Sequence, residues 1–132
     1  MTSNGDLAAT ETGARLAPWM SALVRYVQSN QPDLTNRQLA LLLIVYLLPG
    51  PHTVRGLAAR LHVSKPVITR ALNSLSALGY LRRQRDESDL RNVLVEQTPD
   101  GNDFLKAFAK LIERANDGAT NDEPRRAAAG TQ

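Results

Sequence analysis

Hydrophobic residues recur at spacings of three and four in five stretches of the chain, and this period is typical of helices. The predicted helices span residues 18–28, 36–48, 54–61, 65–78 and 99–115. The second is apolar almost all round, which indicates that it is buried on more than one face. Each of the others carries one apolar stripe and one polar face, as expected for helices that border a hydrophobic core.

Residues that favour helix starts lie at the boundaries of these stretches. Thr35 and Gln38 have the spacing of a capping box, in which each side chain binds the backbone of the other residue. Three further helices follow candidate N-cap residues, namely Thr53, Ser64 and Thr98. The chemistry of the helix ends therefore supports the boundaries that the hydrophobic period predicts.

Two short stretches after the fourth helix, residues 80–83 and 92–96, are predicted strands joined by a polar, charged connection. The chain thus places a helix, a turn, a second helix and a charged hairpin in succession. This order predicts a mainly α fold of the α+β winged-helix type: a winged helix-turn-helix with flanking helices. We expect one domain at residues 15–115, between disordered tails at 1–14 and 116–132.

Positive charge is concentrated on this predicted motif. The whole chain has a formal net charge of +3, whereas residues 55–91 contain eight basic and three acidic residues, a net charge of +5. Such a concentration is expected where a protein contacts a phosphate backbone. A basic face that is simply solvated is the alternative explanation of the charge alone.

The fourth predicted helix has the form of a recognition helix, because it buries one apolar side and exposes small, polar and basic residues on the other. Arg70 and Asn73 are three residues apart, so both can face one groove, where arginine binds guanine and asparagine binds adenine. Ser64 and Lys65 begin the helix, where they can contact a phosphate, cap the helix, or do both. An ordinary solvated helix surface is the alternative. The expected DNA contacts of this helix are Ser64, Lys65, Pro66, Thr69, Arg70 and Asn73.

The hairpin supplies a second group of candidate contacts. We expect Arg82, Arg83 and Arg85 to contact phosphates, which would position the hairpin without specifying a base sequence. Asp89 and Arg91 allow two interpretations. They form either an ordinary exposed ion pair, or an arginine that enters a narrow A·T-rich minor groove beside its own carboxylate.

Composition and motifs exclude several other classes of function. The chain has no cysteine and only two histidines, so neither disulfides nor a metal site is expected. It lacks a glycine-rich phosphate loop and a recognisable nucleophile–base pair, so we expect no enzymatic activity and no cofactor. No apolar run reaches the roughly 18 residues of a membrane span, and no secretory signal is recognisable. These features predict a cytoplasmic protein that has no membrane partner.

Several short motifs occur in an order that is typical of one family. They are Leu34-Thr35-x-x-Gln38, Leu57-Ala58-x-x-Leu61-x-Val63-Ser64, Asp89-x-Arg91 and Thr98-Pro99-x-Gly101. Over roughly residues 34–111 the chain resembles the MarR family of winged-helix transcription regulators. The resemblance implies a homodimeric repressor that binds double-stranded DNA at a pseudo-palindromic site, and that in many members responds to a small-molecule effector. It further implies a recognition helix in the major groove and Arg91, held by Asp89, in the minor groove.

The apolar helices near the ends of the chain are expected to form the dimer interface. The candidate interface residues are Trp19, Leu23, Phe104, Phe108 and Leu111. Trp19, Tyr26 and Tyr46 could also line an effector cavity, although aromatic residues at helical spacing are more often part of a core or an interface. An alternative function is a winged-helix interaction module that docks a different partner chain through its apolar helices, above all the very apolar helix of residues 39–48.

Overall fold

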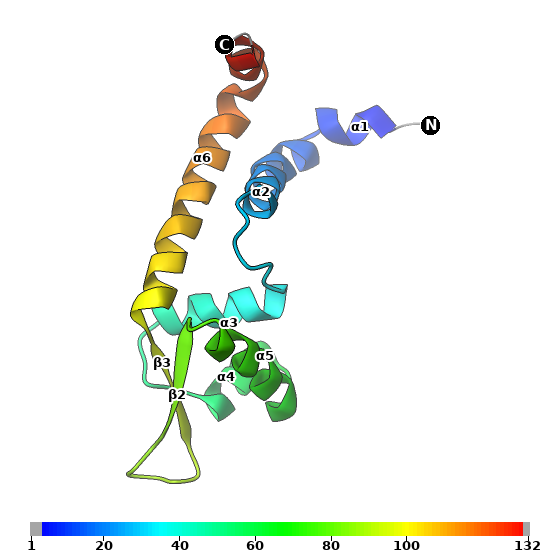
Figure 1. Cartoon of the computed structure of the whole chain (residues 1–132). Coiled ribbons are helices and arrows are strands. Elements are labelled where there is room, and N and C mark those ends of the chain that lie inside the picture. Colours follow the sequence, from blue (N-terminus) through cyan, green and yellow to red (C-terminus); the bar gives the residue numbers. More distant parts are fainter. Residues whose placement is uncertain (1–3, 131–132) are drawn as a thin grey trace. The chain divides into compact units, whose positions relative to one another are not determined.

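The computed structural model describes the backbone of residues 4–130 and the side chains of residues 6–117 (Figure 1). The chain forms two compact units. The winged-helix unit comprises Leu34–Lys106, and the helical unit combines the chain before Leu34 with the chain from Ala107 onward. The predicted domain of residues 15–115 is therefore divided between two units.

The winged-helix unit contains the elements that the sequence predicts, in the predicted order. They are α3 (Asn36–Leu47), β1 (His52–Thr53), α4 (Val54–Leu61), α5 (Lys65–Ala77), β2 (Leu81–Arg85), β3 (Val93–Gln97) and the start of α6 (Pro99–Gly130). The strands form an antiparallel sheet in which β3 lies between β1 and β2. The predicted winged helix is thus confirmed, and the extended residues before α4 add a third strand to its sheet.

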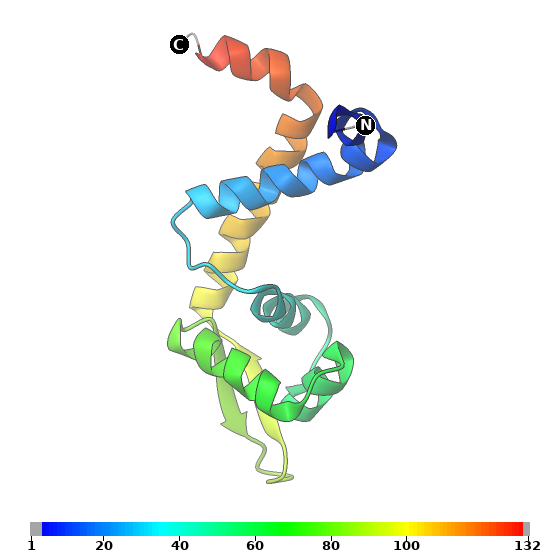
Figure 2. The same cartoon turned by 90° about the vertical axis from the view of Figure 1, so that its right-hand side faces the viewer.

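Strands β2 and β3 form the hairpin that we call the wing. Their register places Arg82 opposite Glu96 and Arg83 opposite Val95. Because successive side chains on a strand point to opposite faces, Arg82 and Arg83 lie on different faces of the wing. The loop of the wing reaches beyond α4 and α5 (Figures 1 and 2).

The core of the winged-helix unit is built from the apolar stripes of its three helices. Its largest fully buried side chains are Leu41, Leu42, Leu57, Ile68, Leu72 and Leu75. Burial of one such side chain contributes about 1.5–3 kcal/mol. Leu81 of β2 and Val95 of β3 are also buried, so the wing is anchored to the helices at its base. The core therefore fixes the position of the wing relative to α5.

The Tyr46 hydroxyl joins three segments of the winged-helix unit. It accepts a hydrogen bond from the Thr98 amide at 2.9 Å and donates one to the Tyr80 carbonyl at 2.8 Å. The Thr98 hydroxyl donates to the Gly79 carbonyl and accepts from the Gly101 amide, so Thr98 caps α6 as predicted. A Cβ atom at Gly101 would lie only 2.0 Å from the Tyr46 hydroxyl oxygen. Tyr46 thus belongs to the framework of the unit.

The predicted helix starts differ in how they are capped. Thr35 and Gln38 form the expected capping box, with the Gln38 amide 3.1 Å from Thr35 Oγ1 and the Thr35 amide 2.9 Å from Gln38 Oε1. Thr53 Oγ1 accepts from the Gly56 amide at 2.9 Å. Ser64 occupies the N-cap position of α5, but its side chain makes no capping hydrogen bond. The expectation that the Ser64 side chain caps the helix is therefore wrong.

The helical unit contains α1 (Asn4–Ala9), α2 (Glu11–Gln28) and the part of α6 from Ala107 onward. Within residues 1–14, expected to form a disordered tail, the chain is helical from Asn4. Thr10 accounts for the start of α2: its hydroxyl accepts from the Gly13 amide at 3.2 Å and so supplies an N-cap. An N-cap of this kind contributes about 1 kcal/mol to the stability of the helix.

Within residues 116–132, the second expected tail, α6 continues to Gly130. Residues 1–3 and 131–132, which complete the two expected tails, lie outside the described residues. Among the residues that the structure describes, no helix is long and apolar enough to cross a membrane.

Candidate nucleic-acid interface

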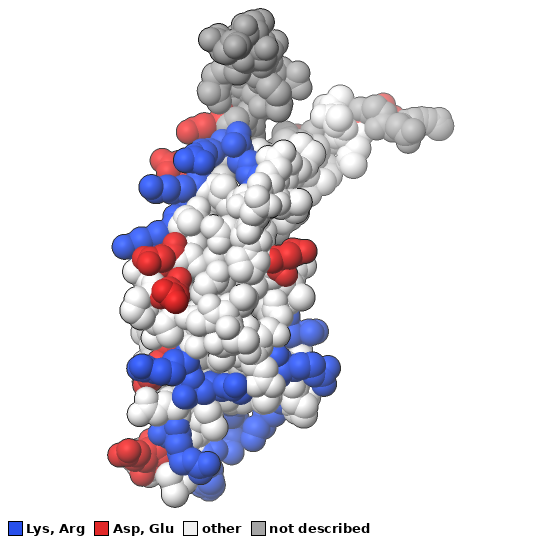
Figure 3. Space-filling model, viewed as in Figure 1, with Lys and Arg blue, Asp and Glu red and all other residues white. Residues whose placement is uncertain are grey.

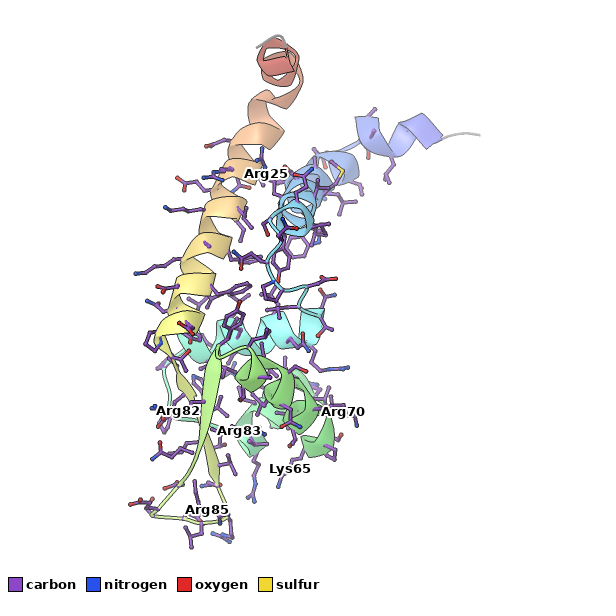
Figure 4. The ribbon with its side chains drawn as sticks, viewed as in Figure 1. Arg25, Lys65, Arg70, Arg82, Arg83 and Arg85 are labelled. Carbon is purple, nitrogen blue, oxygen red and sulfur yellow. The ribbon has the colours of Figure 1, made fainter. Side chains whose placement is uncertain are left out.

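Helix α5 exposes every residue that the sequence analysis assigned to DNA contact from it. These are Ser64, Lys65, Pro66, Thr69, Arg70 and Asn73. The opposite side of the helix is in the core, where Ile68 and Leu72 are fully buried. Lys65 and Arg70 project from α5 in Figure 4. The helix therefore presents one continuous polar and basic face, and its other face is held in place by packing in the core.

The turn between α4 and α5 sets the direction of that face. His62 has φ 57° and ψ 43°, a left-handed conformation that ends α4. Its amide and that of Val63 bind the carbonyl of Ala58, which closes the last turn of the helix. Because few non-glycine residues adopt this conformation without cost, the packing of both helices must hold His62 there.

The wing does not present its three predicted arginines equally. Arg82 pairs with Glu96 across the strands, with Nη2 2.8 Å from Oε1, so much of its charge is compensated within the wing. Arg83 is half-buried and lies on the other face, while Arg85 is exposed near the loop (Figure 4). Only Arg83 and Arg85 therefore remain as strong candidates for phosphate contact from β2.

Asp89 holds Arg91 in a fixed position in the wing loop. Arg91 Nε donates to Asp89 Oδ1 at 3.0 Å, and Nη2 donates to Oδ2 at 3.1 Å. These hydrogen bonds lower the pKa of the Asp89 carboxyl below its usual value, and the charge of Arg55 adds to the effect. The Arg91 side chain is still 81% exposed. Its orientation is thus set before any partner binds.

The loop around this pair is closed by its own hydrogen bonds. Asp86 Oδ1 accepts from the Ser88 amide at 3.0 Å and from the Ser88 hydroxyl at 2.7 Å. These bonds lower the pKa of the Asp86 carboxyl. The Asp86 amide in turn donates to the Asn92 carbonyl across the loop. The acidic residues of the wing therefore shape the loop that carries Arg91.

Basic side chains from α4, α5 and the wing gather on one region of the winged-helix unit (Figure 3). Four of them, Arg55, Lys65, Arg83 and Arg91, line a hollow of about 200 Å³. Arg55 was not among the residues that the sequence analysis assigned to DNA contact. Arg55 lies in the first turn of α4, outside the recognition helix and the wing. Nothing in the sequence around it therefore indicated a DNA contact. The basic hollow thus includes a residue of a helix that the motif pattern had assigned only to support.

The predicted dimer residues fall into different environments. Trp19 is 63% exposed and Leu23 45% exposed on α2. Phe108 and Leu111 are half-buried on α6, and the Phe108 ring packs edge-to-face on Tyr26. Phe104 is buried in the winged-helix unit, where it stacks on Tyr80 at 4.6 Å between ring centroids. The assignment of Phe104 to the dimer interface is therefore corrected, because its surface is already covered within the protomer.

The exposed apolar surface of α2 extends beyond Trp19 and Leu23, the two residues of this helix that were predicted to lie in the dimer interface. Leu16, Met20, Val24 and Val27 are between 46% and 74% exposed on the same helix.

Among the described residues, no group of three or more histidine, cysteine, aspartate or glutamate side chains could hold a metal ion.

Comparison with known proteins gives a consistent result. Residues 33–92 match the model of the MarR family. The chain is similar to the crystal structure of MarR, with 29% identity, a TM-score of 0.58, and coverage of 74% of this chain and 79% of that one. No protein with a curated functional description matches the sequence.

Two further solved structures, each in complex with DNA, are similar in fold. FabT from Streptococcus pneumoniae is 20% identical, with a TM-score of 0.63 and coverage of 96% of this chain and 87% of that one. MepR from S. aureus is 18% identical, with a TM-score of 0.64 and coverage of 96% and 98%. The resemblance stated from the sequence motifs is confirmed where the family model matches. The segment of residues 33–92, which holds the helix-turn-helix and most of the wing, is a MarR-family segment.

Proposed function

We propose that the protein is a sequence-specific, double-stranded DNA-binding transcription regulator that acts as a homodimer. The observation that carries the proposal is the exposed face of α5, where Lys65, Arg70 and Asn73 stand beside a basic wing on one surface. The MarR-family segment supports it, as do the similar folds of FabT and MepR, both solved with DNA. The proposal includes no catalytic reaction, and it places the protein in the cytoplasm, where it has access to the genome.

In this function, α5 lies in the major groove. Arg70 donates two hydrogen bonds to O6 and N7 of a guanine, and Asn73 pairs with N6 and N7 of an adenine. A helix that is buried on its opposite face keeps these side chains in register with the base edges. The recognition helix thereby supplies the base specificity.

The wing lies in the adjacent minor groove, where Arg91 is the residue that enters. A narrow A·T-rich minor groove has an enhanced negative potential that attracts an arginine. Because Asp89 already orders the Arg91 side chain, less conformational entropy is lost on binding. Arg85, nearby on the wing, contacts the phosphate backbone.

Two copies of the chain read the two halves of a pseudo-palindromic site. The exposed apolar face of α2 and the half-buried Phe108 and Leu111 of α6 form the dimer contact. Half-sites of such dimers are about one helical turn apart, roughly 34–36 Å. A dimer seated on a promoter excludes the transcription machinery, so repression is the proposed outcome, and a small-molecule effector would release it.

The test is a shift assay with operator DNA that has been identified by genome-wide mapping of bound fragments. Simultaneous Arg70→Ala, Asn73→Ala and Arg91→Ala substitutions remove the proposed base contacts. We expect operator binding to fall to the level of a random duplex, a loss of roughly 10³-fold or more. Arg114→Ala, which removes an exposed arginine from α6, is the control and should leave binding unchanged. Operator preference that persists in the triple variant would overturn the proposal.

The exposed apolar face of α2 also suits a second function, an interaction module that docks a different partner chain. The two functions differ in their response to salt. A DNA reader retains duplex DNA at low salt and releases it steeply as the salt concentration rises. A chain that retains no duplex even at low salt would instead be the interaction module.

A further inference from the structure

The basic hollow lies between the first turn of α4, the N-terminal half of α5 and the wing. Arg55 comes from α4, Lys65 and Thr69 from α5, and Arg83 and Arg91 from the wing. None of the described residues that line the hollow is acidic. Three separate elements therefore converge to place four cationic side chains around one small space.

Only one of these four cations has a carboxylate partner among the described residues. Arg91 pairs with Asp89 just outside the lining. Arg55, Lys65 and Arg83 have no ion pair in the described part of the chain. Like charges held this close repel one another, which is costly unless an anion enters between them. The charge arrangement therefore fits a single anionic group.

The geometry of the duplex indicates which anion this is. When α5 occupies the major groove and the wing occupies the neighbouring minor groove, one sugar-phosphate strand separates the two grooves. That strand has to pass between α5 and the wing, and the hollow lies at this place. A backbone phosphate is thus brought to the three unpaired cations.

We infer that the hollow binds one phosphate of the strand between the two grooves, and that Arg55 of α4 is a DNA-contacting residue together with Lys65 and Arg83. The inference rests on the proposed function. The Thr69 hydroxyl, in the same wall, supplies a further hydrogen-bond donor. A contact of this kind carries no base information, but it fixes the register in which α5 and the wing meet their grooves.

The test compares Arg55→Gln with Arg60→Gln. Both residues are exposed arginines on α4, but Arg60 does not line the hollow. Dissociation constants are measured for the operator and for a random duplex over a range of salt concentrations. For Arg55→Gln we expect the salt slope to fall by about 0.9, the contribution of one phosphate, with an affinity loss of about fivefold at 0.15 M salt on both duplexes. Arg60→Gln should change neither quantity.

A modified duplex locates the phosphate. A single neutral methylphosphonate is placed, one position at a time, along the strand between the grooves. At one position it should weaken wild-type binding at least as much as Arg55→Gln does, and it should weaken that variant less than it weakens the wild type, because Lys65 and Arg83 remain. Losses that add at every position would overturn the inference, as would a slope for Arg55→Gln equal to that of Arg60→Gln, or a loss confined to the operator. A wild-type protein that binds no duplex at low salt would instead overturn the proposed function itself.

Discussion

At the scale of single residues, two positions of the winged-helix unit have almost no freedom to change. Gly101 lies against the Tyr46 hydroxyl and the Tyr80 carbonyl, and a Cβ atom there would come within 2.2 Å of both oxygens. Tyr46 in turn accepts a hydrogen bond from the Thr98 amide, one of the backbone groups at the start of α6 that has no partner within the helix. The Thr-Pro-x-Gly motif is thus explained by one cap and one close approach of the backbone.

Gly101→Ala is expected to lower the free energy of unfolding by about 1–3 kcal/mol, because the added methyl group has to displace backbone as well as the tyrosine. Chemical denaturation of the two proteins measures the difference. Asn102→Ala, at the exposed neighbouring position, is the control and should stay within about 0.5 kcal/mol of the wild type. Equal stability of the Gly101→Ala variant would show that the turn can move aside.

At the scale of elements, the wing combines a rigid base with a charged loop. Leu81 and Val95 anchor its strands in the core, while hydrogen bonds to Asp86 and Asp89 order the loop. The acidic residues of the wing thus reduce its net charge and yet prepare it for an anionic partner. Loop order, and not charge alone, is what they contribute.

Asp89→Asn separates the effect of the negative charge of Asp89 from its effect on the order of the wing loop. It removes a negative charge near DNA, which by itself favours binding, but it also frees Arg91. We expect weaker operator binding, by roughly two- to tenfold, the cost of ordering one long side chain. Glu87→Gln removes the same charge from an exposed position in the same loop and should leave binding equal or tighter. If both variants bound alike, Asp89 would have no positioning role.

The lowered pKa of Asp89 also determines how the pair responds to pH. The carboxylate holds Arg91 at every pH above the usual aspartate range, near 3.9, and releases it only as the pH falls through the lowered value. Operator affinity between pH 5 and pH 8 should therefore not change through this pair. A carboxyl NMR titration should give an Asp89 midpoint below the usual value, and a midpoint above it would contradict the hydrogen bonding described.

At the scale of the whole molecule, the apolar residues that remain exposed are concentrated on α2. Six large apolar side chains of this helix are at least 45% exposed, which is more than is usual for a helix that faces only solvent. An unpartnered surface of this size in each protomer favours contact with a second copy. In the proposed function, the homodimer contact therefore lies on the helical unit and the DNA contact on the winged-helix unit.

Combined Trp19→Glu and Leu23→Glu substitutions should weaken the dimer at least tenfold, because each buries a charge in the contact surface. Light scattering over a concentration series measures the change. Leu90→Glu, at a leucine of the wing that is 61% exposed, is the matched control and should leave the mass unchanged. A double variant that remains a dimer would show that the contact lies elsewhere on the chain.

The sequence predicted those features that depend on residues close together along the chain. The helix-turn-helix, the wing and the cap at Thr98 follow from hydrophobic period and from local side-chain chemistry. The helical residues beyond 115 escaped prediction because their composition has no apolar stripe. Phe104 was misplaced for the opposite reason: an apolar stripe marks burial, but it does not say whether the covering surface belongs to the same chain.

The features that depend on register or on contacts across the fold could not be predicted. The pairing of Arg82 with Glu96 requires the strand register, and the convergence of Arg55 with Arg83 requires the packing of α4 against the wing. Both change the list of expected phosphate contacts. Arg82 becomes a weaker candidate for phosphate contact, and Arg55 is added as a new candidate.

That register has a consequence for how the protein can vary. Side chains alternate along β2, so Arg83 and Arg85 share one face and Arg82 has the other. A slip of one residue between β2 and β3 would exchange these faces. In one direction it would move Arg82 to the place of Arg83 opposite Val95, and in the other it would move Arg83 opposite Glu96 and put Gln84 in its place. The length of the loop between the strands thus specifies which arginines can meet DNA. Substitutions in this loop therefore leave the strand register unchanged, whereas single-residue insertions and deletions would shift it.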